Sequence, residues 1–223
     1  MTSAALQIAA LLTMLVDHLG YALFPGEDWM RMIGRLSFPL FAFMLSEGFI
    51  NTKNRRNYVG RLAVFALLSE IPYRLFARHS LSGGSMFSNI FYELLLIFLA
   101  LACLELAEKQ RKYLVLGSIA ALAVAVSAEL LSTMYGAYGV LMAIGFYVFR
   151  KRPWAGQLCL ILLTAVYCLY KGSWFQIYAA AAAIPLFFYN GQRGRRLPRY
   201  FGYVFYPAHL LLIYGVYHLQ RFI

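Results

Sequence analysis

Charged residues are scarce in this sequence. Only 13% of the 223 residues are Asp, Glu, Lys or Arg, and 62% are apolar, whereas an ordinary soluble domain carries about 25% charged residues. Long apolar stretches separated by short polar connectors fill the chain, and about 20 apolar residues suffice for a helix to cross roughly 30 Å of hydrocarbon. The composition therefore predicts an all-α, polytopic transmembrane helical bundle that forms one domain over residues 1–223.

Several familiar catalytic signatures are absent. The sequence has no G-x-S-x-G, no phosphate-binding loop, no H-E-x-x-H and no C-x-x-C. Its three cysteines, Cys103, Cys159 and Cys168, lie inside apolar stretches at spacings that indicate neither a disulfide nor a metal site. No Lys or Arg precedes Arg31 and no small-residue cleavage pattern follows the first stretch, so we expect a first membrane span rather than a removable signal peptide.

Apolar runs and turn residues divide the chain into about nine membrane segments. Pro25-Gly26, Lys171-Gly172 and Asn190-Gly191 mark three of the connectors. We place the segments at residues 4–24, 30–50, 58–77, 86–106, 113–131, 138–149, 155–170, 174–189 and 200–220. The sixth, 138–149, is short for a full crossing.

Basic residues are concentrated on alternate connectors, after the second, fourth, sixth and eighth segments. Fourteen of the 20 Lys and Arg residues lie there: Lys53, Arg55, Arg56, Arg61, Lys109, Arg111, Lys112, Arg150, Lys151, Arg152, Arg193, Arg195, Arg196 and Arg199. Short loops rich in Lys and Arg stay in the cytoplasm, which predicts a cytoplasmic N-terminus and, with nine crossings, an extracytoplasmic C-terminus. Topology explains most of the +11 net charge, so we expect no nucleic-acid partner, although some cations remain available for an anion at the inner face.

Several charged or imidazole side chains lie inside the apolar segments, where one charge costs about 2.5–3.5 kcal/mol. They include Asp17, His18, Arg35, Glu47, Glu70, Glu93, Glu129 and His209. Their positions along the segments put Asp17, His18, Arg35, Glu70, Glu93 and Glu129 at one level in the outer half of the bilayer, and Glu47 near the inner end. Two interpretations stay open: a functional site, or an Arg–carboxylate network that only holds the bundle together.

His18 is the candidate general base of such a site, because a neighbouring carboxylate can orient an imidazole and stabilise its protonated form. Asp17 is adjacent in sequence, but adjacent helical residues point about 100° apart, so Glu70 or Glu93 are alternative partners. Arg35 or Asn89 are candidate oxyanion donors. The candidate site residues are therefore His18, Asp17, Arg35, Glu70, Asn89 and Glu93; His209 is as well explained by a structural role as by a catalytic one.

Sequence blocks along nearly the whole chain resemble the TraX family of bacterial membrane proteins. The blocks are Met14–Gly20, Ile33–Phe43, Ser46–Phe49, Asn51–Asn54, Leu68–Pro72, Tyr135–Gly136 with Tyr138–Val140, Tyr189–Gly191 with Arg193-Gly194, and Phe205–Leu210. They occur in the family's order. One departure is Met134, where the resemblance leads us to expect an aspartate before the Tyr-Gly pair.

The resemblance implies an acetyltransferase of the bacterial cytoplasmic (inner) membrane. Such an enzyme moves an acetyl group from cytoplasmic acetyl-CoA to an amine or hydroxyl of an extracytoplasmic acceptor, which is a pilin N-terminus in the family and could also be a glycan or a lipid. Inner-face residues are then expected to hold the phosphates of acetyl-CoA: Arg55, Arg56, Arg193, Arg195 and Arg196, with Asn190. A proton-coupled transporter or flippase is the alternative, because buried His and carboxylate side chains on proline-broken helices also form transport sites.

Overall fold

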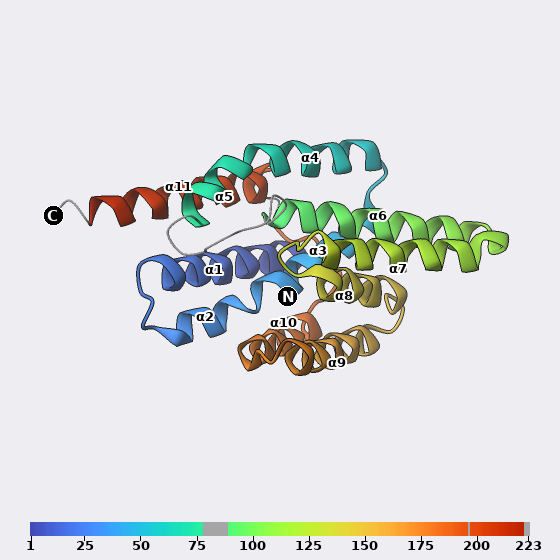
Figure 1. The fold of residues 1–223 in the computed structure, drawn as a ribbon. Coiled ribbons are helices and arrows are strands. Elements are labelled where there is room, and N and C mark those ends of the chain that lie inside the picture. Colours follow the sequence, from blue (N-terminus) through green and yellow to red (C-terminus); the bar gives the residue numbers. More distant parts are fainter. Residues whose placement is uncertain (78–88, 196, 221–223) are drawn as a thin grey trace.

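The computed structural model describes residues 1–77, 89–195 and 197–220, which form helices and connectors without strands (Figure 1). In chain order the helices are α1 (Ser3–Ala22), α2 (Asp28–Gly34), α3 (Ser37–Asn51), α4 (Arg55–Leu68), α5 (Glu70–Ala77), α6 (Ile90–Lys109), η1 (Arg111–Tyr113), α7 (Leu114–Leu130), α8 (Gly136–Val148), α9 (Pro153–Lys171), η2 (Trp174–Ala182), α10 (Ala183–Phe187) and α11 (Phe201–Leu219). The all-α prediction is confirmed for these residues.

Five helical stretches in the described ranges are long and apolar enough to cross a membrane: Ser3–Ala22, Asp28–Asn51, Ile90–Lys109, Arg111–Leu130 and Pro153–Lys171. Gly136–Val148 and Trp174–Phe187 are apolar but shorter. The structure therefore supports a helical membrane protein with five long spans, and the prediction of about nine comparable crossings is not supported. Segment 58–77 is broken and segments 138–149 and 174–189 form short helices, whereas segment 200–220 forms the 19-residue helix α11, which is long enough but not apolar enough to be counted.

Two of the predicted segments are interrupted next to a proline. Segment 58–77 breaks at Ser69, and segment 30–50 breaks after Gly34. Pro72 and Pro39 are each the third residue of the helix that follows the break. Proline lacks an N–H and clashes with the preceding turn, but it is tolerated in the first turn of a helix, where N–H groups have no intrahelical partner. Starting a new helix therefore accommodates each proline.

The centre of the bundle is α3, which packs against α1, α6 and α8. Phe38, Leu40 and Phe49 of α3 are almost fully buried, as are Ile97 of α6 and Val140 of α8. By contrast, α7 and α9 expose rows of large apolar side chains, including Val115, Ile119, Leu162 and Leu169. An extensive exposed apolar surface of this kind is typical of helices that face lipid.

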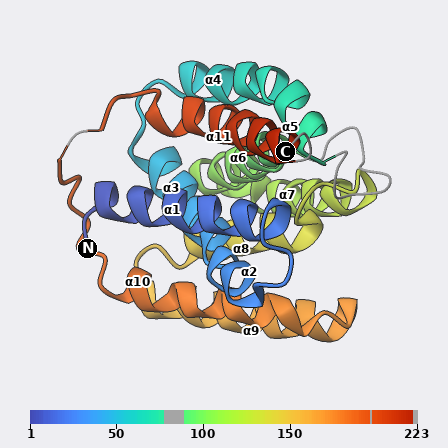
Figure 2. The same ribbon diagram turned by 90° about the vertical axis from the view of Figure 1, so that its left-hand side faces the viewer.

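The basic connectors lie at one end of the bundle. In Figure 1 the turns after α3, α6 and α8 are on the right, and the α1–α2 turn with Glu27 and the end of α9 are on the left. Helices α1, α4 and α11 run side by side in the same direction in both views (Figure 2). This arrangement agrees with the topology expected from the Lys and Arg distribution, and we refer to the basic end as the inner end.

The chain start is attached to the connector that precedes α11. The Met1 ammonium donates to the Phe188 carbonyl, and the Asn190 N–H donates to the Met1 carbonyl (3.0 Å). The Ser3 and Ala4 N–H groups donate to the carbonyls of Gln192 (2.8 Å) and Arg193 (3.0 Å). These bonds supply partners for the first N–H groups of α1 and fix the connector against the inner end of the bundle.

Candidate active site

Two cavities lie end to end beside α1. The inner cavity, of about 240 Å³, includes Ser3, Gln7 and Met14 of α1 in its wall. The outer cavity, of about 220 Å³, includes Asp17, His18 and Tyr21 of the same helix. Both walls contain Met14, Phe41, Ile90 and Tyr206. The two cavities therefore meet at these four side chains and together extend from the inner end of the bundle towards the opposite end.

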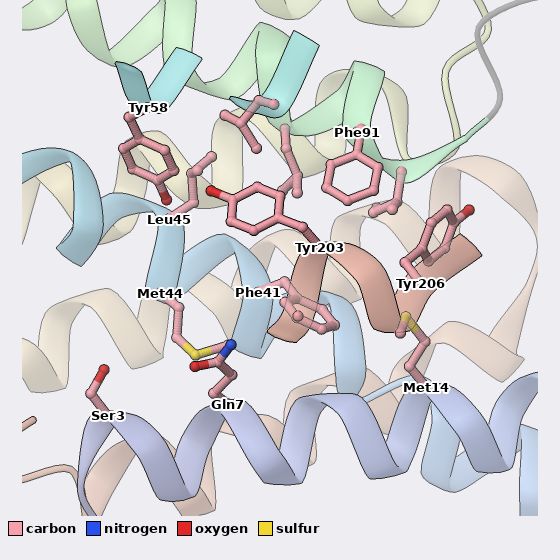
Figure 3. Close-up of a pocket in the computed structure, with 14 residues that line it drawn as sticks. Ser3, Gln7, Met14, Phe41, Met44, Leu45, Tyr58, Phe91, Tyr203 and Tyr206 are labelled. Carbon is pink, nitrogen blue, oxygen red and sulfur yellow. The ribbon is translucent and has the colours of Figure 1, made fainter. Parts of the chain in front are cut away.

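The inner cavity is mainly apolar and aromatic. Figure 3 shows Ser3, Gln7 and Met14 spaced along α1, with Tyr203 and Tyr206 of α11 opposite them. Tyr58 of α4 and Phe91 of α6 form the wall farthest from α1 (Figure 3). A cavity lined in this way suits a slender, largely apolar group better than a charged one.

His18 faces the outer cavity and is hydrogen-bonded to His209. His18 Nδ1 lies 2.6 Å from His209 Nε2, and the two ring planes differ by only 11°. That nitrogen–nitrogen distance is too short for face-to-face stacking, so the rings meet edge to edge. His209 is 4% exposed and is not part of the wall of either cavity described so far. The structure thus identifies His209 as the partner of His18, whereas the sequence favoured neither a catalytic nor a structural role for His209.

The hydrogen bonds assign the tautomers of both histidines. His209 Nδ1 lies 2.8 Å from the Phe205 carbonyl oxygen, which can only accept, so His209 Nδ1 carries the proton. His209 Nε2 of the neutral ring must then accept, and His18 Nδ1 donates to it. The remaining nitrogen, His18 Nε2, keeps its lone pair. The chain Phe205–His209–His18 therefore leaves a basic nitrogen on the residue that faces the cavity.

Asp17 does not orient His18, although the sequence made Asp17 one candidate partner of that imidazole. Its carboxylate accepts from Arg31 (2.9 Å) and Arg35 (2.8 Å), on another side of α1, as the angle between adjacent helical residues allows. Gly34 packs directly against the Asp17 side chain, where a Cβ would overlap it. Two guanidinium groups around one carboxylate leave a net positive charge in the wall of the outer cavity.

Arg31 is the residue of this group that sequence reasoning missed. The available signal was its spacing, because Arg31 and Arg35 are four residues apart and such residues lie on one helix face. Arg35 also lies 3.5 Å from the amide oxygen of Gln176, while its Nε is buried and has no hydrogen-bond partner among the described residues. A buried donor without a partner is costly. Because Arg35 is also part of the cavity wall, it is the candidate to bind an oxyanion in the cavity.

Glu70 and Asn89 contact each other rather than His18. The Asn89 side-chain amide donates to Glu70 Oε2 (2.7 Å) and to the Ala66 carbonyl (3.0 Å), and its oxygen caps α6 by accepting from the Phe91 N–H (3.1 Å). Glu70 also accepts from Arg74 (2.6 Å). Neither Glu70 nor Asn89 belongs to the wall of the outer cavity. These hydrogen bonds connect the chain at the α4–α5 break to the first turn of α6.

Glu93 is fully buried and fixes the loop that leads into α8. Its Oε2 accepts from the Tyr135 N–H (3.2 Å), and Glu129 accepts from the Ala137 N–H (3.1 Å) and from Lys171 (2.7 Å). Carboxylates are favourable at a helix N-terminus, and α8 begins at Gly136. Glu93 is absent from the wall of the outer cavity, whereas Tyr135, which it holds, is part of that wall.

The residues expected to bind acetyl-CoA are spread over the inner end. Arg55 pairs with Glu105 and covers the Phe49 ring, whereas Arg56, Arg193 and Arg195 have exposed side chains. Asn190 is exposed and accepts from the Gln192 N–H (3.1 Å). Arg196 lies outside the described residues. The inner-end cations that are exposed are thus Arg56, Arg193 and Arg195, with others on neighbouring connectors.

Arg61 lies closer to the inner cavity than these residues. Its guanidinium carbon is 5.5 Å from the centre of the Tyr58 ring and 5.9 Å from that of Tyr203, and both rings are part of the cavity wall. Its Nε is buried without a hydrogen-bond partner among the described residues. Sequence reasoning counted Arg61 only towards topology. The described residues contain no group of three His, Cys, Asp or Glu side chains that could hold a metal ion.

Comparison with known proteins agrees with the resemblance seen in the sequence. Residues 2–217 match the family described as TraX protein. The chain belongs to the TraX family. It is also 29% identical over 226 residues, which cover 93% of this chain and 92% of the relative, to a protein of Dichelobacter nodosus described as "Probable fimbrial assembly protein FimC, serogroup H1". No solved structure matches the chain.

Four of the sequence blocks that resemble the TraX family meet at the outer cavity, including Tyr135–Gly136, which supplies Tyr135. Met14–Gly20 supplies Asp17 and His18, Ile33–Phe43 supplies Arg35, and Phe205–Leu210 supplies His209 and its Phe205 partner. Met134, where the resemblance leads us to expect an aspartate, is also part of the cavity wall. In this TraX chain a thioether therefore occupies a position at which the expected residue would add a carboxylate to the cavity.

Proposed function

We propose that this TraX-family membrane protein transfers an acetyl group from cytoplasmic acetyl-CoA to an acceptor on the far side of the bacterial cytoplasmic membrane. The observation that carries the proposal is the pair of cavities that leads from the inner, basic end of the bundle to His18. Such a path allows a donor on one side of a membrane to react with an acceptor on the other, without either molecule crossing it.

The inner cavity accommodates the slender arm of the donor in this mechanism. Ser3 and His18 are 15 positions apart on one helix, which corresponds to about 22 Å along the axis. Acetyl-CoA is extended, with phosphates at one end and the thioester at the other. Arg61 beside the inner cavity, with Arg193 and Arg195 on the attached connector, would bind the phosphates, because guanidinium groups suit them geometrically.

His18 acts as the general base in the proposed reaction. As the acceptor nitrogen or oxygen attacks the thioester carbon, His18 Nε2 takes the proton that the acceptor loses. The new oxyanion is stabilised by the guanidinium of Arg35, a residue of the outer cavity wall. The intermediate then expels the CoA thiolate, which receives the proton from His18. The acceptor leaves as an amide or ester, and CoA leaves as a thiol.

A pilin subunit is the acceptor that we propose. One support is the TraX family itself, whose resemblance implies modification of a pilin N-terminus. The other is the fimbrial assembly description of the 29% identical relative. The wall of the outer cavity, in which Tyr135, Tyr167 and Gln176 accompany His18, combines aromatic faces with polar groups and is compatible with a short peptide end.

Purified protein in liposomes with labelled acetyl-CoA and a peptide copy of a pilin N-terminus tests the proposal. We expect His18→Gln to lower the transfer rate by roughly 10²–10⁴-fold, the usual contribution of a general base. His218→Gln, in the last turn of α11, is the matched control and should retain the rate. A His18→Gln protein that transfers acetyl at a near wild-type rate would exclude His18 as the base.

A proton-coupled transporter is the second candidate, favoured by the direct hydrogen bond between two membrane-embedded imidazoles. The same liposomes discriminate between the two functions. Solute-dependent proton flux without any acyl donor would support transport, and it should be lost in His18→Gln and in His209→Ala. Acetyl transfer without such flux supports the enzyme.

A further inference from the structure

A third cavity, of about 550 Å³, lies among the inner ends of α3, α8, α9 and α10. Its wall includes Glu47, Arg150, Trp154, Gln157, Phe187 and Tyr189. It shares no wall residue with the inner or outer cavity. Its wall also includes Asn190, one of the residues that the family resemblance leads us to expect at the acetyl-CoA phosphates. We call it the leaflet cavity.

Glu47 differs from the other carboxylates in the membrane helices. Asp17, Glu70 and Glu129 form ion pairs, as do Glu105 and Glu108, and Glu93 accepts from a backbone N–H. Glu47 forms no ion pair within the described part of the chain, and its carboxylate accepts from the Tyr189 hydroxyl at 3.4 Å. A half-buried carboxylate with so weak a partner is unfavourable in a membrane, and a cationic ligand would compensate it.

A cation lines the same cavity. Arg150 is held in place by Glu108 (2.8 Å) and by the Tyr147 ring, 4.4 Å from its guanidinium carbon. Lys151 and Arg152 follow it on the connector and have exposed side chains. The leaflet cavity thus presents a carboxylate within its wall and a cluster of positive charge at its connector side. A zwitterion with an ammonium and a phosphate matches this distribution.

The leaflet cavity also lies at the level of lipid headgroups. Glu47 is one turn from the end of α3, Arg150 follows α8, and Trp154 is in the first turn of α9; all three are at the inner, basic end. Trp154 and Phe187 are 63% and 70% exposed, and exposed aromatic rings near basic residues are typical of a membrane interface. The ligand is therefore expected from the inner leaflet.

We propose that the leaflet cavity binds the headgroup of an aminophospholipid of the phosphatidylethanolamine class. Its primary ammonium would donate hydrogen bonds to Glu47 and to the Tyr189 oxygen, and its phosphate would lie towards Arg150 and the 150–152 connector. A quaternary choline headgroup has the same charge but no N–H to donate. A phosphatidylglycerol headgroup has no cation for Glu47. The assignment does not rest on the proposed acetyl transfer.

Binding of short-chain phospholipids to the purified full-length protein, measured by native mass spectrometry and by thermal shift, tests the assignment. The probes are phosphatidylethanolamine, phosphatidylcholine and phosphatidylglycerol with identical acyl chains. We expect wild-type protein to bind the ethanolamine lipid about tenfold more tightly than either other lipid, the effect of one charge-assisted hydrogen bond. Glu47→Gln should abolish this preference, and Glu27→Gln, at the opposite end of the bundle, should retain it.

Two results would overturn the assignment. One is equal affinity of the wild-type protein for the ethanolamine and choline lipids, a comparison that remains valid if Glu47→Gln fails to fold. The other is competition: if CoA displaces the ethanolamine lipid, the leaflet cavity belongs to the acyl donor and not to a lipid. Neither result depends on acetyl transfer, so the assignment can fail while the proposed function stands.

Discussion

Two groups of charged residues in the outer half of this bundle differ in what they face. Asp17, Arg31 and Arg35 form ion pairs in the wall of a cavity, next to His18. Glu93 and Glu129 instead accept backbone N–H groups of the loop that starts α8. The first group retains a net positive charge and a donor without a partner among the described residues. The second group holds the backbone of that loop and lies outside the cavity wall, although Glu93 Oε1 is also buried without a hydrogen-bond partner among the described residues.

The difference separates two reasons for placing charge in a membrane. A charge that faces a cavity and has an unused hydrogen-bonding position can interact with a ligand. A charge that lies outside the cavity wall and accepts backbone N–H groups mainly specifies the fold. On this basis, substitutions in the first group should change acetyl transfer, and substitutions in the second group should change stability.

Replacement of Arg35 gives the largest expected effect within this comparison. Arg35→Lys keeps the charge near Asp17 but removes the fork that allows one side chain to bind both Asp17 and an oxyanion. We expect the transfer rate to fall roughly 10²–10³-fold, the usual cost of losing one oxyanion donor, with the thermal unfolding temperature little changed. The measurement is single-turnover acetyl transfer in liposomes.

Arg31→Lys is the matched control for Arg35→Lys, because Arg31 binds the same carboxylate. Its transfer rate should fall much less. Equal losses in the two variants would show that the Asp17 network acts as a structural unit and that Arg35 has no separate role at the oxyanion.

Replacement of His209 is expected to have an intermediate effect, because His209 acts through His18. His209→Ala removes the acceptor of the His18 Nδ1 proton and should lower the transfer rate about 10–100-fold, as loss of an orienting partner does. His209→Gln can offer an amide oxygen at a similar place and should recover part of the rate. A structural role predicts instead that the rates follow the folded fraction of each variant. The comparison of Ala with Gln at equal folded fraction decides between the two.

The sequence was sufficient for the helical membrane class of the protein, but not for the partners of its buried charges. Apolar length indicated a helical membrane protein but predicted about nine segments, whereas five stretches in the described ranges are long and apolar enough to cross a membrane. Depth along each segment grouped Asp17, Glu70 and Glu93 at one level, because depth follows from residue number and helical rise. Which side chains meet at that level depends on helix rotation and packing, which one sequence does not specify.

Partner choice therefore differed from expectation at particular residues. Asp17 pairs with Arg31 and Arg35 instead of His18, because neighbouring helical residues point in different directions. His18 is hydrogen-bonded to His209, which is 191 residues away in the chain. Asn89, a candidate oxyanion donor, instead caps α6, which begins at the next residue. Contacts between residues so far apart in the sequence produce no local sequence pattern from which they could be predicted.

Glu93 provides the last test of the comparison, with the smallest expected effect on transfer. Glu93→Gln keeps the shape but weakens the charge-assisted bond to the Tyr135 N–H, so we expect stability to fall by about 1–3 kcal/mol, seen as a lower thermal unfolding temperature. Lys171→Met removes a half-exposed ion pair of the same loop and should cost less than about 1 kcal/mol. Folded Glu93→Gln protein should transfer acetyl within a few-fold of wild type. If its rate instead collapses while its stability is unchanged, Glu93 belongs with the cavity-facing charges, and the division between the two groups is wrong.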